Sequence, residues 1–311
     1  MQKPEVSACI VSYNQAPYIE RCLQSLLDQG GGHSLEILIS DDGSTDGTRD
    51  IIARLAAQHP DIIHPFFQEK NLGPTQNYYF IHRQARGKFV VHMDGDDFAL
   101  PGKLAAQVSY LKLHPECMAV VHKLQFWDKR GNRVERVYPD RFRCKIYDMR
   151  NLVLDHPVFL HSALMYREGG LNGILEEGPE NLVDFYLYIH LVSQGAFGTI
   201  DDVMGGYTHA IGISTKMNLI KLVVEALDYA KTLGLSDADY NRKLSEQYYF
   251  FSLKAFADDK DYEHFKKLIT LSVHIRIFSL RQLGLYVFKN SSKLIANIKK
   301  FKEYFSNPQN R

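Results

Sequence analysis

Four short apolar runs, each separated from the next by a stretch with helical spacing, constrain the fold of this chain more than any other feature. The runs are residues 6–12, 35–39, 62–67 and 88–93. They show little apolar–polar alternation, which is typical of strands buried on both faces. Between the first two runs, Ile19, Cys22, Leu23 and Leu26 recur at helical spacing. Strands that alternate with helices predict an α/β fold with a mostly parallel central sheet and helices on both faces.

Two clusters of carboxylates directly follow two of these runs. Asp41 and Asp42 follow the second run, and Asp94, Gly95 and Asp96 follow the fourth. In sheets of this class ligands bind at the carboxyl ends of strands, so both clusters should lie on one edge. Carboxylate oxygens are the ligands that Mg²⁺ and Mn²⁺ prefer, and the glycine lets a ligand approach the backbone. An isolated Asp-x-Asp is more often a solvated acidic turn, but the upstream cluster favours a ligand site.

The order and spacing of four motifs resemble glycosyltransferase family 2, which has the GT-A fold. The motifs are Ser12-Tyr13-Asn14, Asp41 to Thr48, Asn71-x-Gly73 and Met93 to Asp97. The resemblance covers about residues 4–215. It implies an inverting, metal-dependent enzyme that transfers a sugar from a nucleotide-sugar donor, a UDP-sugar, to a hydroxyl of a glycan or a lipid-linked glycan.

The resemblance also implies roles for individual residues. Tyr13 would stack on the base, and Asp41 or Asp42 would accept its N3–H. Asp94 would contact the ribose or the metal shell, and Asp96 would be the main ligand of Mn²⁺ or Mg²⁺ on the donor's diphosphate. The other nucleotide-binding and metal-binding candidates are Asn14, Asn71, Gly95 and His209.

The general base of that family is the Asp of a Glu-Asp pair that opens a helix. Counting back from Gly195, this Asp corresponds to Asp184, whereas Val183 stands where the family has Glu. Glu180, one turn earlier, could replace the missing carboxylate. From the residues alone, Asp184 is more often an acidic residue in the first turn of a helix, where the helix dipole favours it.

His209 follows Tyr207 and Thr208, where the family often has Tyr-Arg-x-His. This similarity makes His209 a candidate metal or diphosphate contact, although its spacing is imperfect. A lone histidine is more often a packed or hydrogen-bonded residue than a ligand.

Residues between the metal motif and the base motif are expected to bind the acceptor. The pattern predicts strands at 117–126 and 159–166 and a hairpin turn at 129–132. Trp127 could form a platform for a sugar, but packing in the core is the commoner use of such a residue.

The pattern changes to helices at about residue 216, which predicts a catalytic domain at 1–215 and a helical region at 216–311. The last thirty residues are rich in Lys and Arg, and Leu294, Ile298 and Phe301 keep to one side of a predicted terminal helix. Such a helix can lie at an anionic membrane surface, or it can pack on its own protein. The helical region could also form a homodimer.

Composition excludes several other classes of protein. The 37 Lys and Arg nearly balance 36 Asp and Glu, so no global field recruits nucleic acid. The four cysteines lie far apart, which favours reduced thiols over structural zinc. No run of some 18 uncharged apolar residues and no signal-peptide segment stand out, so we expect a cytoplasmic protein without a membrane span.

Two alternatives to the transferase stay open. A catalytically silent module that binds nucleotide-sugars or glycans would tolerate Val183 and Thr208. A sugar nucleotidyltransferase would also combine a parallel sheet with a metal-bound nucleotide, but it usually carries a Gly-rich basic loop after the first strand. Residues 12–17 do not resemble such a loop.

Overall fold

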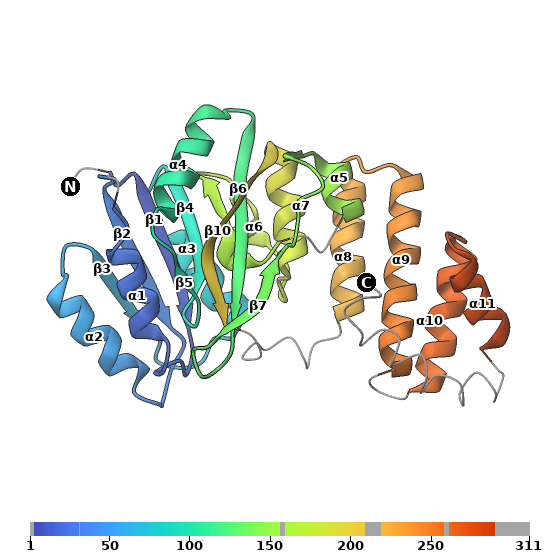
Figure 1. Ribbon diagram of the computed structural model, residues 1–311, viewed down its shortest axis with the longest axis horizontal. Coiled ribbons are helices and arrows are strands. Elements are labelled where there is room, and N and C mark those ends of the chain that lie inside the picture. The colour runs from blue at the N-terminus through green and yellow to red at the C-terminus, as the bar shows by residue number, and fades with distance from the viewer. Residues whose placement is uncertain (1–2, 31, 156–158, 209–218, 258–260, 290–311) are drawn as a thin grey trace. The chain divides into compact units, whose positions relative to one another are not determined.

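The computed structural model describes residues 3–30, 32–155, 159–208, 219–257 and 261–289 (Figure 1). The chain forms two compact units, residues 1–217 and 218–311. The first unit is a mixed α/β structure around one sheet, and the second contains helices. The structure thus confirms the predicted α/β class with a C-terminal helical region.

The central sheet of the first unit has ten strands. Its main order is β3-β2-β1-β4-β9-β6-β10-β5, with β7 paired to β6 and β8 paired to β10. The strands β1 to β4 run parallel, as do β6 and β10, whereas β9 is antiparallel to both its neighbours. The strands are β1 (Val6–Ser12), β2 (Leu35–Asp41), β3 (Ile63–Phe67), β4 (Phe89–Asp94), β5 (Phe98–Ala99), β6 (Cys117–Trp127), β7 (Arg133–Tyr138), β8 (Ile146–Tyr147), β9 (Met165–Arg167) and β10 (Ala196–Thr208).

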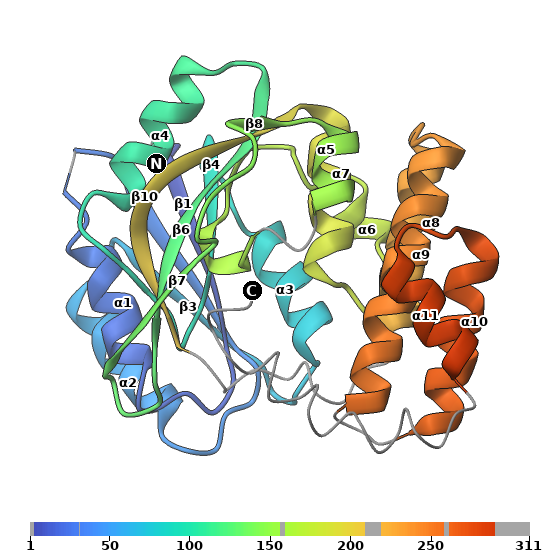
Figure 2. The same ribbon diagram turned by 45° about the vertical axis from the view of Figure 1, so that its right-hand side comes forward.

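Helices cover both faces of this sheet. Successive side chains along a strand point to opposite faces, so each strand contributes to the packing on both sides of the sheet. On β4, Val91 and Met93 pack in one apolar cluster with residues of α1, α2 and α4. His92, between them, faces α3 on the other side, where it meets His82. Figure 2 shows α1 and α2 on one side of the strands and α3 on the other. The helices are α1 (Ile19–Leu27), α2 (Thr48–Gln58), α3 (Pro74–Arg83), α4 (Lys103–Leu113), α5 (Met149–Asp155), α6 (Ile174–Glu177) and α7 (Asp184–Gln194).

The register of the parallel strands brings the two acidic clusters to one edge. Ser12, the last residue of β1, pairs with Asp41 on β2. On the other side of β1, Val11 pairs with Asp94 on β4. The two carboxylate clusters therefore flank the end of the same central strand, as the sequence predicts.

Two predicted boundaries in this unit are wrong. The expected strand at 159–166 is instead a 3₁₀ turn, η1 (His161–Ala163), followed by the short β9. The turn forms because Lys103 and Gln107 of α4 donate hydrogen bonds to the carbonyl groups of Ser162 and Ala163. The sequence pattern also predicts a helix over residues 76–86 that ends at Gly87, but α3 ends before Gln84. Gly87 instead lies against β1, where a Cβ would come within 2.5 Å of a backbone nitrogen.

The second unit consists of helices, as the change of pattern at about residue 216 predicts. Leu222, Val223, Ala226 and Leu227 of α8 are buried, as their spacing indicates. None of the described helices is long and apolar enough to cross a membrane. The predicted basic helix after residue 290 lies outside the described residues. The helices are α8 (Leu219–Thr232), α9 (Asp237–Ala257), α10 (Tyr262–Ile275) and α11 (Leu280–Phe288).

Candidate active site

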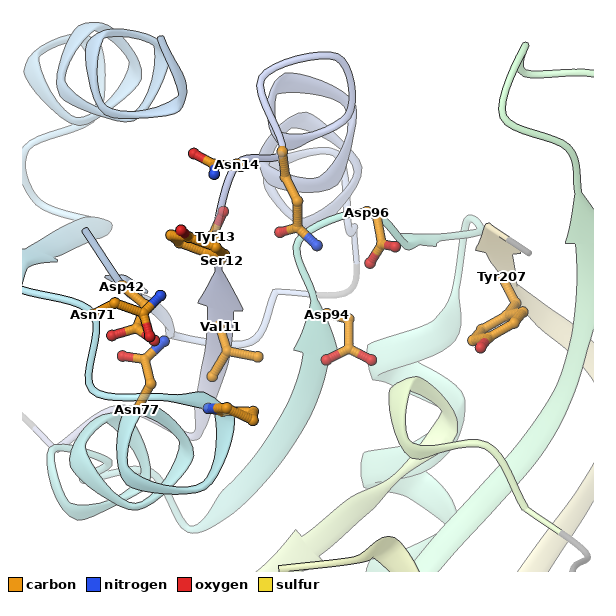
Figure 3. A pocket seen from close by; sticks show the side chains of 12 residues that line it. Val11, Ser12, Tyr13, Asn14, Asp42, Asn71, Asn77, Asp94, Asp96 and Tyr207 are labelled. Carbon is orange, nitrogen blue, oxygen red and sulfur yellow. The ribbon is translucent and has the colours of Figure 1, made fainter. Parts of the chain in front are cut away.

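A pocket of about 480 Å³ lies at the carboxyl ends of β1, β2 and β4. We call it the donor pocket after the role that we propose for it, and Figure 3 shows its lining side chains. Tyr13 and Asp42 lie on one side of it, with Asp94 and Asp96 on the other. The lining residues are Val11, Ser12, Tyr13, Asn14, Gln15, Asp42, Asn71, Pro74, Asn77, Asp94, Asp96 and Tyr207.

The loop after β1 is held by hydrogen bonds to the loop after β2. The backbone N–H of Asn14 donates to Ser44 Oγ at 2.8 Å, and the N–H of Thr45 donates to Asn14 Oδ1 at 2.9 Å. These bonds hold Asn14 at a positive φ of 52°, a conformation that asparagine tolerates better than most residues. The neighbouring Tyr13 is 45% exposed and lines the pocket, so its ring is available to a ligand.

The two carboxylates of the first cluster have different surroundings. Asp41 is 1% exposed, accepts the N–H of Ser44, and forms an ion pair of 2.7 Å with Arg49. Asp42 lines the pocket, and its oxygens accept the N–H groups of Leu72 and Gly73. Burial is the main cause that raises the pKa of Asp42, and the two N–H groups oppose it. Asp42 is itself only 3% exposed, but it borders the pocket, whereas Asp41 does not.

The second cluster is crowded with like charges. Asp96 is 8% exposed, and burial, followed by repulsion from Asp94, raises its pKa to about 7. Burial also raises the pKa of Asp94, and His161 and Ser162 oppose this shift. Burial raises the pKa of Asp97 well above its ordinary value. The Asp94 side chain is 40% exposed, yet it lies inside the pocket, where protein displaces part of its hydration. A cation beside Asp96 would relieve this repulsion, so these residues fit a divalent metal.

No preformed metal cage exists in the part of the chain that the structure describes. No three His, Cys, Asp or Glu side chains come together there as a metal site. His209 lies outside the described residues. Gly95 does not line the pocket, and a Cβ there would come within 2.9 Å of the Ile19 side chain of α1. A metal at Asp96 would need further ligands from water and donor phosphates.

Thr208, which stands where the family often has Arg, fastens β10 to the metal motif. Its hydroxyl donates to the carbonyl oxygen of Asp96, and its N–H donates to Asp97 Oδ1 at 2.8 Å. Arg21 of α1 donates to the same Asp96 carbonyl at 3.3 Å and to Thr208 Oγ1 at 3.1 Å. No sequence pattern indicated this role for Arg21, because Arg21 lies 75 residues before Asp96 in the chain.

Asp184 lies in a second, smaller pocket of about 190 Å³, which we call the acceptor pocket after the role that we propose for it. Its carboxylate is 56% exposed, and it opens α7 as predicted. The protein around the pocket is the main cause that raises its pKa; His161 opposes this shift, and Asp94 adds to it to a smaller extent. The two pockets share the residues Val11, Pro74, Asp94 and Tyr207.

The acceptor pocket contains residues that no sequence pattern had indicated. His161 places Nδ1 at 4.0 Å from Asp184 Oδ1, and Tyr78 and Leu182 contribute to the wall. The predicted substitute Glu180 is exposed and does not line this pocket. His161, and not Glu180, is therefore the ionisable side chain that lies beside Asp184 in this pocket.

Trp127 is partly buried and does not line either pocket. Its ring meets Phe98 edge-on, with ring centroids 5.3 Å apart. This contact supports packing over a sugar platform for the indole.

Comparisons with known proteins agree with this geometry. The model of the family "Glycosyl transferase family 2" matches residues 7–172, more than half of the chain. An uncharacterised protein of Mycobacterium tuberculosis is 29% identical over 212 residues, which cover 67% of this chain and 60% of that protein. The chondroitin synthase of Escherichia coli is 30% identical over 202 residues, which cover 64% of this chain and 28% of the synthase. The chain thus spans about 60% or less of the length of these relatives.

Two solved structures resemble the chain in fold. S. aureus TarS 1–349 in complex with UDP-GlcNAc has a TM-score of 0.65 and 19% identity, covering 97% of this chain and 91% of that one. The mannosyltransferase PcManGT from Pyrobaculum calidifontis, in complex with GDP-Man and Mn²⁺, has a TM-score of 0.56 and 20% identity, covering 96% and 83%. These two structures show that the chain has the GT-A fold, and the family match shows that it belongs to glycosyltransferase family 2.

Proposed function

We propose that this chain is an inverting, divalent-metal-dependent enzyme that transfers a sugar from a UDP-sugar to a hydroxyl of a growing glycan. The observation that carries the proposal is the donor pocket, which has an aromatic ring and a carboxylate at one side and two crowded carboxylates at the other. A nucleoside diphosphate has matching ends, because its base is flat and its diphosphate is anionic.

At the base end, Tyr13 is free to stack and Asp42 can accept a further hydrogen bond. Each carboxylate oxygen has two lone pairs, so the N–H groups of Leu72 and Gly73 leave acceptor capacity on Asp42. The N3–H of uracil is a suitable donor. TarS, with UDP-GlcNAc bound, supports a uridine donor, whereas PcManGT binds GDP-Man, whose base also carries an N–H.

At the diphosphate end, Asp96 and Asp94 would hold Mn²⁺ or Mg²⁺ against the phosphates. When bound, the metal would stabilise the negative charge on the departing nucleoside diphosphate. The Mn²⁺ in PcManGT supports this assignment by analogy. Asp94 lines both pockets, so it lies where the donor sugar would meet the acceptor.

Asp184 would remove the proton from the attacking hydroxyl. It reaches the acceptor pocket from the start of α7, and its raised pKa makes it a stronger base than an ordinary aspartate. A single base opposite the leaving group suffices for inversion at the sugar carbon.

The glycan acceptor is inferred from chondroitin synthase, whose name gives its product as a glycan. We place the reaction in assembly of cell-surface polysaccharide on the cytoplasmic side, with a lipid-linked glycan as one form of acceptor. We further propose that the basic segment after residue 290 contacts an anionic membrane. We also propose that the helical region forms a homodimer.

The test compares nucleotide binding with transfer in Asp184→Asn. Wild type should bind UDP more tightly with Mn²⁺ and should transfer or hydrolyse the donor sugar. Asp184→Asn should lose about 10²–10⁴-fold in rate and keep its affinity for UDP. Glu180→Gln is the matched control, because it neutralises a carboxylate that does not line the acceptor pocket.

The same experiment separates the enzyme from a silent binding module. If wild type binds Mn²⁺ and UDP-sugars but neither transfers nor hydrolyses them, the proposed catalysis is wrong. If GDP-sugars bind and UDP-sugars do not, the uridine assignment at Asp42 is wrong.

A further inference from the structure

A chain of hydrogen bonds runs from the donor pocket into the layer between the sheet and α3. His92 Nε2 lies 3.2 Å from Asp94 Oδ1, and His92 Nδ1 lies 3.1 Å from His82 Nε2. His82 Nδ1 lies 2.6 Å from the hydroxyl of Tyr166. The chain thus connects Asp94 on β4 with α3 and then with β9.

The chemistry of Asp94 determines the direction of every bond in this chain. An ionised carboxylate can only accept, so His92 must donate through Nε2–H. A neutral imidazole that donates from one nitrogen accepts at the other, so His92 Nδ1 accepts from His82 Nε2–H. By the same rule, His82 Nδ1 accepts the hydroxyl proton of Tyr166. All three donors therefore point toward Asp94.

Burial keeps both imidazoles neutral, as this direction requires. His82 is 3% exposed and His92 is 1% exposed. Burial is the main cause that lowers the pKa of each well below its ordinary value, and the neighbouring histidines add to it. A neutral ring with one donor and one acceptor satisfies both of its nitrogens here.

Aromatic packing holds the rings in place. Tyr78 stacks on His82 with ring centroids 3.9 Å apart, and His161 packs against His92 at 4.1 Å. The backbone of Asp94 is held as well, since its N–H donates to Ser162 Oγ at 3.1 Å. The carboxylate of Asp94 is therefore anchored at one oxygen and at its backbone.

We propose that Tyr166, His82 and His92 form a positioning relay that orients the carboxylate of Asp94 toward the diphosphate and metal of the donor. The inference rests on the proposed function of the donor pocket. In this relay, only His92 touches Asp94, and the other two residues act through it. Hydrogen-bonded partners behind a metal ligand commonly change affinity or activity by about 10–100-fold when they are removed.

Tyr166→Phe tests the relay at its far end, because it removes one hydroxyl and leaves the pocket lining unchanged. We expect the affinity for UDP with Mn²⁺ to fall by roughly tenfold, while the affinity for UDP in EDTA stays the same. Tyr147→Phe is the matched control, since Tyr147 is also buried and its hydroxyl binds Asp155, away from both pockets. If both variants bind UDP with Mn²⁺ as wild type does, the relay does not position Asp94.

A pair of substitutions at His82 provides a second test if Tyr166→Phe fails to fold. His82→Gln retains a side-chain donor for His92, and His82→Leu does not. The affinity for UDP with Mn²⁺ should be lower in His82→Leu than in His82→Gln. Equal affinity in the two variants would contradict the relay.

The tautomers of the two histidines can be measured without any nucleotide. Long-range ¹H–¹⁵N spectra of wild type should show both His82 and His92 as neutral rings with the proton on Nε2. A proton on Nδ1 of either ring would overturn the relay. This readout separates the relay from the proposed function: absence of UDP binding with Nε2 tautomers would refute the transferase mechanism but not the hydrogen-bond chain.

Discussion

Replacing Asp96 by Asn should make the metal-free protein more stable while removing its metal-dependent binding of UDP. The pKa of Asp96 is about 7, against an ordinary value of 3.8, because of burial and the charge of Asp94. This difference corresponds to about 4 kcal/mol of unfavourable free energy for the charged form in the folded state. Asn has nearly the same shape without the charge, so it avoids this cost.

The pH dependence follows from the sign of the shift. Because the pKa is raised on folding, protonated Asp96 stabilises the folded state at low pH, and that stabilisation is lost as pH rises from about 4 to about 7. At pH 8 in EDTA, Asp96→Asn should therefore unfold at a higher temperature than wild type, by at most about 10 °C. The difference should narrow at pH 5.

Differential scanning calorimetry at the two pH values measures this effect, and calorimetric titration of UDP with and without Mn²⁺ measures the loss of binding. Asp61→Asn is the matched control, because Asp61 is exposed. A metal-free Asp96→Asn that unfolds below wild type at pH 8 would refute the idea that Asp96 is held in an unfavourable charged state. Unchanged dependence of UDP affinity on Mn²⁺ would refute its role as a ligand.

Four further substitutions test other parts of the site. Tyr13→Ala should weaken UDP and every UDP-sugar alike, by about 5- to 150-fold, because it removes the stacking ring; a fluorescence titration that finds an effect on one sugar only would contradict stacking. Asp42→Asn should weaken UDP binding and Asp41→Asn should instead lower the melting temperature, since Asp41 is paired with Arg49; the reverse pattern would exchange their roles. Thr208→Val should cost about 1–3 kcal/mol in denaturant unfolding, because it removes the hydroxyl that binds the Asp96 carbonyl and Arg21; an unchanged midpoint would show that this bond does not hold the metal motif.

The sequence predicted the part of the fold that depends on local pattern. The runs at 6–12 and 88–93 became β1 and β4 because continuous apolar residues favour strands buried on both faces. The meeting of the acidic clusters at one edge followed from the parallel arrangement of these strands. Both inferences needed only neighbours in sequence and one general rule of α/β sheets.

Features that depend on distant partners could not be predicted in this way. The segment 159–166 has the composition of a strand, but Lys103 and Gln107 bind its carbonyl groups and impose a turn. That turn places His161 beside Asp184. His82 and Tyr166 likewise lie 84 residues apart, and no periodic pattern relates them.

The charges around the two acidic clusters explain why only one of them is available to a cation. Asp41 is neutralised within the protein by Arg49. Arg21 and Lys103 lie near the second cluster, but they donate to the carbonyl groups of Asp96 and Ser162. Within the described residues, no Lys or Arg forms an ion pair with Asp94, Asp96 or Asp97. Burial and mutual repulsion raise the pKa values of these carboxyl groups, and a metal bound to a diphosphate would favour their charged form at that position.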